Sequence, residues 1–322
     1  MYAVLVAEDQ TLVWSEVPDP APKAGELLVD VHAAALNRAD LLQREGNYPP
    51  PPGWPEWMGL EVAGVVVDAP AECRWKAGDQ VCALLGGGGY AERVAVPADL
   101  AVRVPEGLSM VEAAAIPEAF ATSYLNVCIE GGMKAGDTVL IHAGASGLGI
   151  AAIQLTKTLG GKVMTTVGTK EKAEFVRRLG ADVVIHRTVD DLGAAMEEHA
   201  VDIALDCISG PALGQCIERM AIGGRWIVIA TLGGALTEIN MNTFFRRGIK
   251  LIGSTLRSRS SEMKTEILAG LERTLWPSFS SGAIKPVIYK TLPITEAEEA
   301  HAILQRRENI GKVVLTVKRN AP

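Results

Sequence analysis

Hydrophobic positions in the first part of the chain come in short runs that glycine and proline separate. The runs 26–35, 59–67 and 80–85 have this form between residues 1 and about 118. Short apolar runs between turn residues are typical of strands in a β-rich, barrel-like domain. The segment 48–53 contains four consecutive prolines, which cannot donate to a sheet ladder, so we expect a rigid surface loop there.

From about residue 119 the pattern changes, because apolar strand-like runs begin to alternate with helical patterns. Alternation with short connections predicts a parallel sheet covered on both faces, and therefore an α/β protein. The strand-like runs are 138–142, 162–167, 183–185, 203–207, 226–230 and 251–253, and the two clearest helical patterns are 148–159 and 170–179.

The last part of the chain contains a long helical pattern over 261–280 and a strand over 312–317. Between them a second helix is expected from Thr295, because Thr295 and Glu298 have the spacing of a capping box. A chain of 322 residues exceeds the usual size of one hydrophobic core. We expect two domains, the first built from residues 1–118 and 259–322 and the second from residues 119–258.

Composition and charge exclude several classes of partner. Apolar residues make up 48% of the chain and charged residues 21%, as in globular proteins. The net charge of −7 offers no broad basic surface, so we expect neither nucleic acid nor membrane as a partner. The five cysteines form no CxxC pair, and the acidic N-terminus does not resemble a signal peptide. We therefore expect a cytoplasmic protein.

The most informative motif is the glycine-rich run 142–149, which follows an apolar strand and opens a helical pattern. It contains Gly144, Ser146, Gly147 and Gly149, a GxxGxG pattern with serine at the usual middle glycine. In this context, main-chain N–H groups at a helix N-terminus can bind the pyrophosphate of a dinucleotide. The alternative is a tight turn that needs glycine only for packing.

The residues that follow indicate which dinucleotide is bound. Sites for NAD often carry an acidic residue at the end of the second strand, but Gly168 stands there in this chain. Lys172 follows it, and Arg187 comes after the third strand. Cations near this position suit a 2′-phosphate, so we predict NADPH. The alternative is that these are solvated charges of the helix and loop.

At this point the sequence resembles the medium-chain dehydrogenase/reductase superfamily. The runs that carry the resemblance are 35–40 (ALNRAD), 59–64 (GLEVAG), 136–144 (GDTVLIHAG) and 311–314 (GKVV). Within the superfamily the chain resembles the zinc-free, zeta-crystallin-like quinone oxidoreductases, above all the branch known in animals as tumour-suppressor-induced. The resemblance implies a GroES-like β-barrel domain and a Rossmann domain that bind NADPH between them.

The same resemblance bears on metal, because other members of the superfamily bind zinc. Where those members have Cys and His ligands, this chain has Asn37 and Leu60, and the third position falls at Glu118. Leucine has no lone pair and a neutral amide is a poor zinc ligand. The cysteine-rich lobe that binds structural zinc is also missing at 85–90. We expect no metal, and without a Lewis acid a quinone is an easier acceptor of hydride than an alkoxide-forming substrate.

The resemblance also implies site residues by position. Asn37 and Tyr48 are the expected catalytic groups, with Tyr48 donating to the substrate oxygen as charge develops; the alternative for Tyr48 is packing against the prolines. The expected cofactor contacts are Asn37, Thr122, Gly144, Ser146, Gly147, Leu148, Gly149, Gly168, Lys172, Arg187, Cys207, Ile208, Ala230, Leu232, Leu256, Asn309 and Lys312. The apolar members of this set could equally be core residues.

Three functions remain open from the sequence. The leading one is NADPH-dependent reduction of quinones. The second is reduction of the C=C bond of enals, enones or enoyl thioesters at the same cofactor site. The third is binding of NADPH by a redox sensor without turnover. The resemblance further suggests a homodimer or homotetramer formed at the sheet edge near 251–254.

Overall fold

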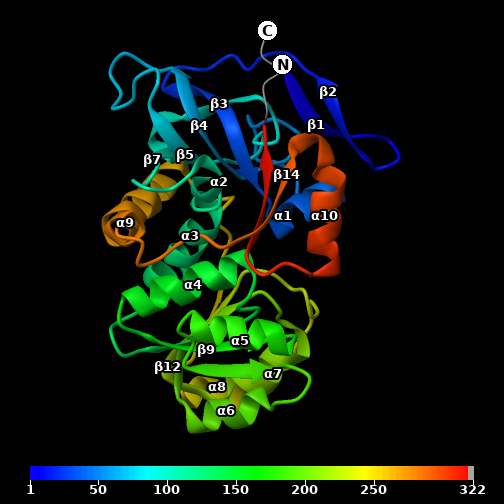
Figure 1. The fold of residues 1–322 in the computed structure, drawn as a ribbon. Coiled ribbons are helices and arrows are strands. Elements are labelled where there is room, and N and C mark those ends of the chain that lie inside the picture. Colours follow the sequence, from blue (N-terminus) through cyan, green and yellow to red (C-terminus); the bar gives the residue numbers. More distant parts are fainter. Residues whose placement is uncertain (318–322) are drawn as a thin grey trace. The chain divides into compact units, whose positions relative to one another are not determined.

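The computed structural model describes residues 1–317, and its contacts divide the chain into two compact units (Figure 1). The first unit contains the residues up to Ala121 together with those from Arg257 onward, and the second is Thr122–Leu256. The boundaries expected from the sequence, 118 and 258, lie three and two residues away from these positions. Each unit has its own main sheet.

The first unit is built on a seven-stranded sheet that is antiparallel except for one pair. Its order is β14-β15-β3-β4-β5-β7, with β6 paired to β3. Only β14 and β15 run parallel to each other, and a separate hairpin joins β1 to β2. The strands are β1 (Tyr2–Val6), β2 (Leu12–Glu16), β3 (Glu26–Ala35), β4 (Glu61–Asp68), β5 (Gln80–Leu84), β6 (Arg93–Pro97), β7 (Ala101–Arg103), β14 (Ile288–Pro293) and β15 (Lys312–Thr316).

Strand β3 organises this sheet, since it pairs with β4, β6 and β15. Its side chains alternate between buried and half-buried over most of its length, and its last three residues, Ala33–Ala35, are all buried. Small side chains at this end let two neighbouring strands pack closely beside it. As a result β15, from the end of the described chain, lies directly beside the residues that precede Asn37.

The helices of the first unit cover the sheet at several places. They are α1 (Arg38–Arg44), η1 (Ala98–Leu100), α2 (Met110–Ala113), α3 (Pro117–Tyr124), α9 (Ser261–Ser280), η3 (Ile294–Glu296) and α10 (Ala297–Arg306), with α3 crossing the boundary between the units. Helix α9 has the bounds that its pattern predicts. The Ser260 hydroxyl caps it by accepting from Met263 N at 3.3 Å, and Phe279 near its end packs edge-on against Phe120 of α3.

The expected start of α10 is wrong. The helix begins at Ala297, after a 3-10 turn, and no side chain caps it. The carboxylate of Glu298 instead accepts from Leu12 N at 2.9 Å and pairs with Arg44 Nη2 at 2.7 Å. A cation and a free N–H from other segments are stronger partners for a carboxylate than the N-terminal N–H of its own helix.

The second unit is a six-stranded parallel sheet in the order β10-β9-β8-β11-β12-β13. Numbered along the chain, this is the order 3-2-1-4-5-6 of a dinucleotide-binding fold. The direction of winding reverses between β8 and β11, and ligands of such sheets bind beyond the carboxyl ends of the strands at that point. The strands are β8 (Thr138–Ile141), β9 (Lys162–Val167), β10 (Val183–His186), β11 (Val201–Asp206), β12 (Met220–Val228) and β13 (Lys250–Gly253).

Helices on the sheet of the second unit give it a closed core. Leu140, Met164 and Trp226 from the strands pack with Met196 of α6 and Leu213 of α7, all fully or almost fully buried. Strands β11 and β12 begin earlier than their apolar runs predict, because Asp202 in β11 and Gly223, Gly224 and Arg225 in β12 interrupt the apolar pattern. The helices are η2, a π-helical turn (Leu125–Glu130), α4 (Gly147–Thr158), α5 (Lys170–Arg178), α6 (Leu192–Glu198), α7 (Gly210–Ile217) and α8 (Met241–Arg246).

Within residues 1–317, none of the helices combines the length and the apolar character needed to cross a lipid bilayer.

One buried side chain of α10 makes the stability of the protein depend on pH. His301 is fully buried, neither ring nitrogen has a hydrogen-bond partner, and burial lowers its pKa to about 4. Between pH 6.5 and 4 the unfolded chain therefore binds a proton that the folded protein excludes, so stability falls as the pH falls. We expect this group to account for up to about 3 kcal/mol of that loss.

Replacing His301 by Leu should flatten the dependence of unfolding free energy on pH between 7 and 4.5, as measured by urea unfolding. His199→Leu, at an exposed position, provides the control and should leave the slope unchanged. Equal slopes in the His301→Leu variant and the wild-type protein would contradict this prediction.

Candidate functional site

The glycine-rich turn between β8 and α4 is held by close packing. A Cβ at Gly144 would collide with the side chain of Thr165, and one at Gly149 would lie 2.6 Å from the Cα of Gly144. Gly144 is therefore required for the turn to lie against β9, and Gly149 for the start of α4 to lie against the turn. Ser146, at the usual middle glycine, is the N-cap of α4, and its Oγ accepts from Gly149 N at 3.0 Å.

The position of this turn suits an anion. Helix α4 begins at Gly147 and Leu148, and the first N–H groups of a helix have no partner within it. The helix dipole adds partial positive charge at the same end. Because the turn follows β8, it lies at the point where the winding of the sheet reverses. The packing and the phosphate-binding interpretations are thus compatible at this turn.

His142 holds the turn in place by linking two neighbouring strands. Its Nδ1 lies 3.0 Å from the Oγ1 of Thr166, which joins β8 to β9. Burial lowers the pKa of the imidazole, and its Nε2 lies 4.0 Å from Asp206 Oδ1. A buried ring that links β8 to β9 in this way has a structural role.

A cationic side chain lies where β9 ends, and a second cationic residue follows in α5. Gly168 follows β9, and a Cβ placed on it would lie 3.2 Å from Nη2 of Arg187, so this guanidinium lies over the glycine. Lys172 is in the first turn of α5, and its N–H donates to the cap Thr169 Oγ1 at 3.2 Å. No carboxylate occupies the position of Gly168. The structure therefore brings together Gly168 and Arg187, which the sequence separates by 19 positions.

The loops after β11 and β12 are joined to each other by main-chain hydrogen bonds. Leu232 N donates to Cys207 O at 3.2 Å, and Gly233 N donates to Ile208 O at 2.7 Å. Four residues expected to line the cofactor site thus lie beyond the carboxyl ends of two neighbouring strands: Cys207, Ile208, Ala230 and Leu232. Leu232 is 43% exposed, as a binding residue can be, whereas Leu256 is buried and suits the core alternative equally well.

Asp206 organises these loops and was missed by the analysis of the sequence. Its Oδ1 accepts from the N–H groups of Ile208 at 2.6 Å and Ser209 at 2.9 Å. Its Oδ2 accepts from Trp226 Nε1 at 2.8 Å, and the carboxylate is fully buried. The signal was an acidic residue directly after the apolar run 203–205, a pattern that favours a side chain bonded to the next turn.

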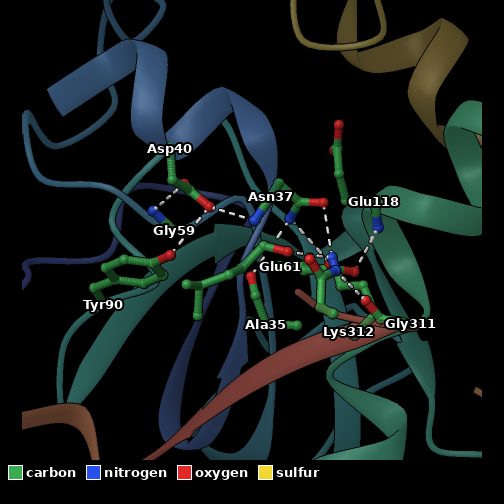
Figure 2. A network of polar contacts seen from close by, with 11 residues as sticks. Ala35, Asn37, Asp40, Gly59, Glu61, Tyr90, Glu118, Gly311 and Lys312 are labelled. Carbon is green, nitrogen blue, oxygen red and sulfur yellow. Dashed lines mark hydrogen bonds and ion pairs between the residues drawn. The ribbon is translucent and has the colours of Figure 1, made fainter. Parts of the chain in front are cut away.

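The first unit contains a buried polar cluster, which Figure 2 shows around Asn37, Glu61 and Lys312. Lys312 Nζ forms an ion pair with Glu61 Oε1 at 2.6 Å and donates to Asn37 Oδ1 at 2.8 Å and Leu36 O at 2.5 Å. Lys312 is 6% exposed and Glu61 is completely buried. An ammonium has three N–H groups, so all three of Lys312 are engaged within this unit.

These contacts fix the amide of Asn37. Its Oδ1 accepts from Lys312, and its Nδ2 donates to Glu61 Oε1 at 3.0 Å, so the two ends of the amide cannot exchange places. Asn309 lies in the turn before β15, and its Nδ2 donates to Gly311 O at 2.6 Å. Both residues were expected near the cofactor. The structure assigns them contacts that shape the first unit, and their contact with a cofactor stays a prediction.

Asp40 joins α1 to the sheet beside this cluster. It accepts from Asn37 N at 2.7 Å, Gly59 N at 3.1 Å and the Tyr90 hydroxyl at 3.1 Å (Figure 2). Burial raises the pKa of this carboxyl to about 6 in spite of the three donors. Asp40 thus fixes the position of Asn37 at the start of α1.

The residues at the expected zinc-ligand positions do not fit a metal. Leu60 is buried, and Lys312 places a cation beside both Asn37 and Glu61. Glu118 donates its N–H to Glu61 Oε2 at 2.8 Å, while its side chain points away from Lys312 in Figure 2. In the described part of the chain, no three His, Cys, Asp or Glu side chains come together as metal ligands.

Two titratable groups beside the cluster have raised pKa values. Burial, together with the charge of Glu61, raises the pKa of the Glu118 carboxyl to about 8. Burial and then the charge of Glu118 raise the pKa of the half-buried Tyr48 phenol, so this phenol keeps its proton at neutral pH. The remaining expected contact, Thr122, is on α3, and its carbonyl accepts from Asn126 Nδ2 at 2.7 Å.

The ion pair of Lys312 and Glu61 gives a testable expectation. Lys312→Met leaves the Glu61 carboxylate buried without a counter-charge and should lower the free energy of unfolding by about 3–5 kcal/mol. Adding Glu61→Gln should recover much of this loss, because no unpaired charge then remains. Urea unfolding followed by circular dichroism measures both effects.

The control for this experiment is Lys157→Met, which breaks an exposed pair with Asp182 and should cost at most about 1 kcal/mol. If the double variant were no more stable than Lys312→Met, the buried charge of Glu61 would not be the cause.

Two family models match the chain. An alcohol dehydrogenase GroES-like domain matches residues 23–106, and a zinc-binding dehydrogenase domain matches residues 147–272. The first lies in the antiparallel sheet, and the second covers most of the parallel sheet and continues into α9. These matches confirm the expected fold class, an α/β protein with a GroES-like domain and a Rossmann-like sheet.

Relatives and solved structures agree with this. The chain is similar to the quinone oxidoreductases of Sus scrofa, at 32% identity, and Homo sapiens, at 31%, each over 94% of this chain and 92% of the relative. A mycobacterial structure complexed with NADPH is 28% identical, with a TM-score of 0.85 over 98% of this chain and 99% of that one.

Two further structures carry other names. A structure described as an NAD-dependent alcohol dehydrogenase is 29% identical, with a TM-score of 0.84 over 99% of this chain and 100% of that one. The CurF ER cyclopropanase of the curacin A pathway is 26% identical, with a TM-score of 0.83 over 98% of this chain and 99% of that one. Since the 32% identity extends over nearly the full length of both proteins, the chain is a medium-chain dehydrogenase/reductase and belongs to the zeta-crystallin-like quinone oxidoreductase family.

Proposed function

We propose that this oxidoreductase uses NADPH to reduce quinones without a metal ion. The observation that carries the proposal comes from the second unit. The N-terminus of α4, which suits an anion, and the guanidinium over Gly168 both follow the carboxyl ends of neighbouring strands. The similarity to quinone oxidoreductases supports the choice of acceptor.

The chain would hold NADPH mainly through its main chain. The N–H groups of Gly147 and Leu148 would meet the pyrophosphate, with Gly144, Ser146 and Gly149 setting the turn. Arg187 and Lys172 would bind the 2′-phosphate beside Gly168. The other proposed contacts are Asn37, Thr122, Cys207, Ile208, Ala230, Leu232, Leu256, Asn309 and Lys312.

The proposed chemistry divides between cofactor and protein. Bound NADPH supplies a hydride to an electron-poor conjugated acceptor. The protonated phenol of Tyr48 would donate a hydrogen bond, and then its proton, to the acceptor oxygen on which negative charge develops. Asn37, whose amide is fixed by Lys312 and Glu61, would orient the cofactor or the substrate oxygen. Because the zinc-ligand positions do not fit a metal, purified protein should contain no stoichiometric zinc by elemental analysis.

A second candidate is reduction of the C=C bond in enals, enones or enoyl thioesters. The likeness to CurF ER favours it, and the same cofactor site and proton donor would serve. A redox sensor that binds NADPH without turnover remains the alternative of another class; it would bind the cofactor and consume neither acceptor.

The proposed partners are a small conjugated substrate and a second copy of the chain. Edge strand β13 exposes Leu251, which suits assembly into a homodimer or homotetramer, and light scattering would test this. All five cysteines are free thiols, which suits the proposed cytoplasmic location.

The cofactor preference is tested by comparing kcat/KM for NADPH and NADH. We expect NADPH to be preferred, and Arg187→Gln to lower kcat/KM for NADPH by about tenfold, or about 1.4 kcal/mol, with little change for NADH. Arg178→Gln, an exposed arginine of α5, is the matched control. A preference of the wild-type protein for NADH would refute the cofactor assignment.

The role of Tyr48 is tested with a naphthoquinone and an enal assayed side by side. Tyr48→Phe should lower kcat on the better acceptor by about a hundredfold or more, since it removes a general acid. The KM for NADPH should change little. Tyr289→Phe removes an exposed phenol of β14 and should leave turnover intact. Unchanged kinetics in Tyr48→Phe would remove this residue from the mechanism, while the choice between quinone and enal would stand on the wild-type rates.

A further inference from the structure

Arg257 is a buried arginine whose guanidinium is almost completely used by the first unit. It is 5% exposed, and its Nε and Nη2 both donate to Gly86 O, at 2.8 and 2.5 Å. Its Nη1 donates to Tyr48 O at 2.9 Å, and Nη2 also donates to Gln43 Oε1 at 2.7 Å. A guanidinium has five N–H donors in a planar fork, and four hydrogen bonds leave it with little freedom.

The same guanidinium lies over the aromatic ring of Tyr48. Its Cζ is 4.8 Å from the centroid of the ring, within the range of a cation–π contact. Arg257 thus holds Tyr48 at two places, the main-chain carbonyl and the face of the ring. These two contacts fix both the position of the loop and the direction of the side chain.

Neighbouring residues hold Arg257 and the loop in turn. Lys264, which is buried in α9, donates from Nζ to Arg257 O at 2.8 Å. Gln43 donates from Nε2 to Glu56 O at 2.6 Å, so it links the arginine to the far end of the proline-rich loop. A Cβ on Gly86 would lie 2.6 Å from the indole of Trp54. Only glycine at position 86 therefore allows Trp54 to pack this close to the residue whose carbonyl Arg257 binds.

We propose that Arg257 is a positioning residue for Tyr48, which it holds in the orientation needed to donate a proton to the acceptor. This inference rests on the proposed function, in which Tyr48 is the proton donor. Burying a guanidinium is costly unless it is fully hydrogen-bonded. The hydrogen bonds that offset this cost join the loops at Tyr48 and Gly86, which have no regular structure of their own, to Gln43 of α1.

The charge of Arg257 also acts on the phenol. Among the charged groups near Tyr48, Glu118 disfavours the phenolate and Arg257 favours it. When Tyr48 gives up its proton, the cation over the ring is ready to stabilise the phenolate that remains. Burial lowers the pKa of the Arg257 guanidinium, while Tyr48, Asp40 and Glu118 oppose this effect and favour its charged form.

Lysine cannot replace this arginine. An ammonium keeps the charge but lacks the planar fork that reaches Gly86, Tyr48 and Gln43 together. Arg257→Lys should therefore keep the fold and the charge while releasing the loop. We expect it to lower kcat by about tenfold, because a small misplacement of a catalytic group is enough for such a loss. KM for NADPH should stay within about twofold, since the cofactor contacts proposed above are unchanged.

The decisive experiment is a double-mutant cycle on kcat with Arg257→Lys, Tyr48→Phe and the combined variant. If Arg257 acts through Tyr48, the combined variant should be no slower than Tyr48→Phe, within about twofold. Multiplied losses, or a wild-type kcat in Arg257→Lys, would overturn the proposal.

Arg103→Lys, at an exposed arginine paired with Asp79, is the matched control and should behave as the wild-type protein. Gln43→Ala, which removes one acceptor, is the second variant should Arg257→Lys fold poorly, and the same non-additivity is expected of it.

Amide hydrogen exchange separates this inference from the proposed function. In Arg257→Lys, exchange in peptides that cover 43–57 and 84–90 should become faster, while exchange in β8 and α4 stays unchanged. This readout needs no turnover. Faster exchange in a protein that reduces neither quinone nor enone would show that the loop is held as described and that the proposed function fails. If exchange in Arg257→Lys were unchanged while the enzyme stayed active, the proposed role of Arg257 alone would be overturned. If Tyr48→Phe had wild-type kinetics, the role of Arg257 would also be overturned, but quinone reduction as the function would stand.

Discussion

The ion pair between Lys312 and Glu61 is the interaction on which the arrangement of the first unit depends. It joins the last strand of the described chain to β4, and through Asn37 it reaches the start of α1. Both charges are buried, so each requires the other. Strands β14 and β15 follow the second unit along the chain but belong to the sheet of the first unit. The ion pair of Lys312 and Glu61 fixes the position of β15 in that sheet.

The same cluster explains how a protein of a superfamily with zinc-binding members can keep its architecture without the donors that zinc needs. A lysine ammonium contacts the amide of Asn37 and the carboxylate of Glu61, and Leu60 fills the adjacent space with apolar atoms. A fixed cation thus remains beside Asn37. An ammonium has no empty coordination position, so it can orient a neighbouring amide but cannot polarise an alkoxide as a Lewis acid would.

In the second unit a few residues position several loops. Asp206 folds the turn after β11, and main-chain hydrogen bonds join that turn to the loop after β12. Gly144 lets the turn lie against β9, Gly149 lets α4 start against the turn, and Arg187 lies over Gly168. The two units therefore share one feature. A buried charged group satisfies the polar atoms of irregular loops, which leaves those loops rigid enough to bind a ligand.

The sequence by itself determined the alternation of strands and helices, the bounds of β3, β9 and α9 and the glycine turn before α4, because each depends on residues close together along the chain. Tertiary structure alone decided the partners of Lys312, Arg257, Asp206 and Glu298. Arg257 and Gly86 are 171 positions apart, and Lys312 and Leu36 are 276 apart. A long charged side chain can satisfy its hydrogen bonds with any suitable acceptor that folding brings within reach, so local pattern does not specify its partner.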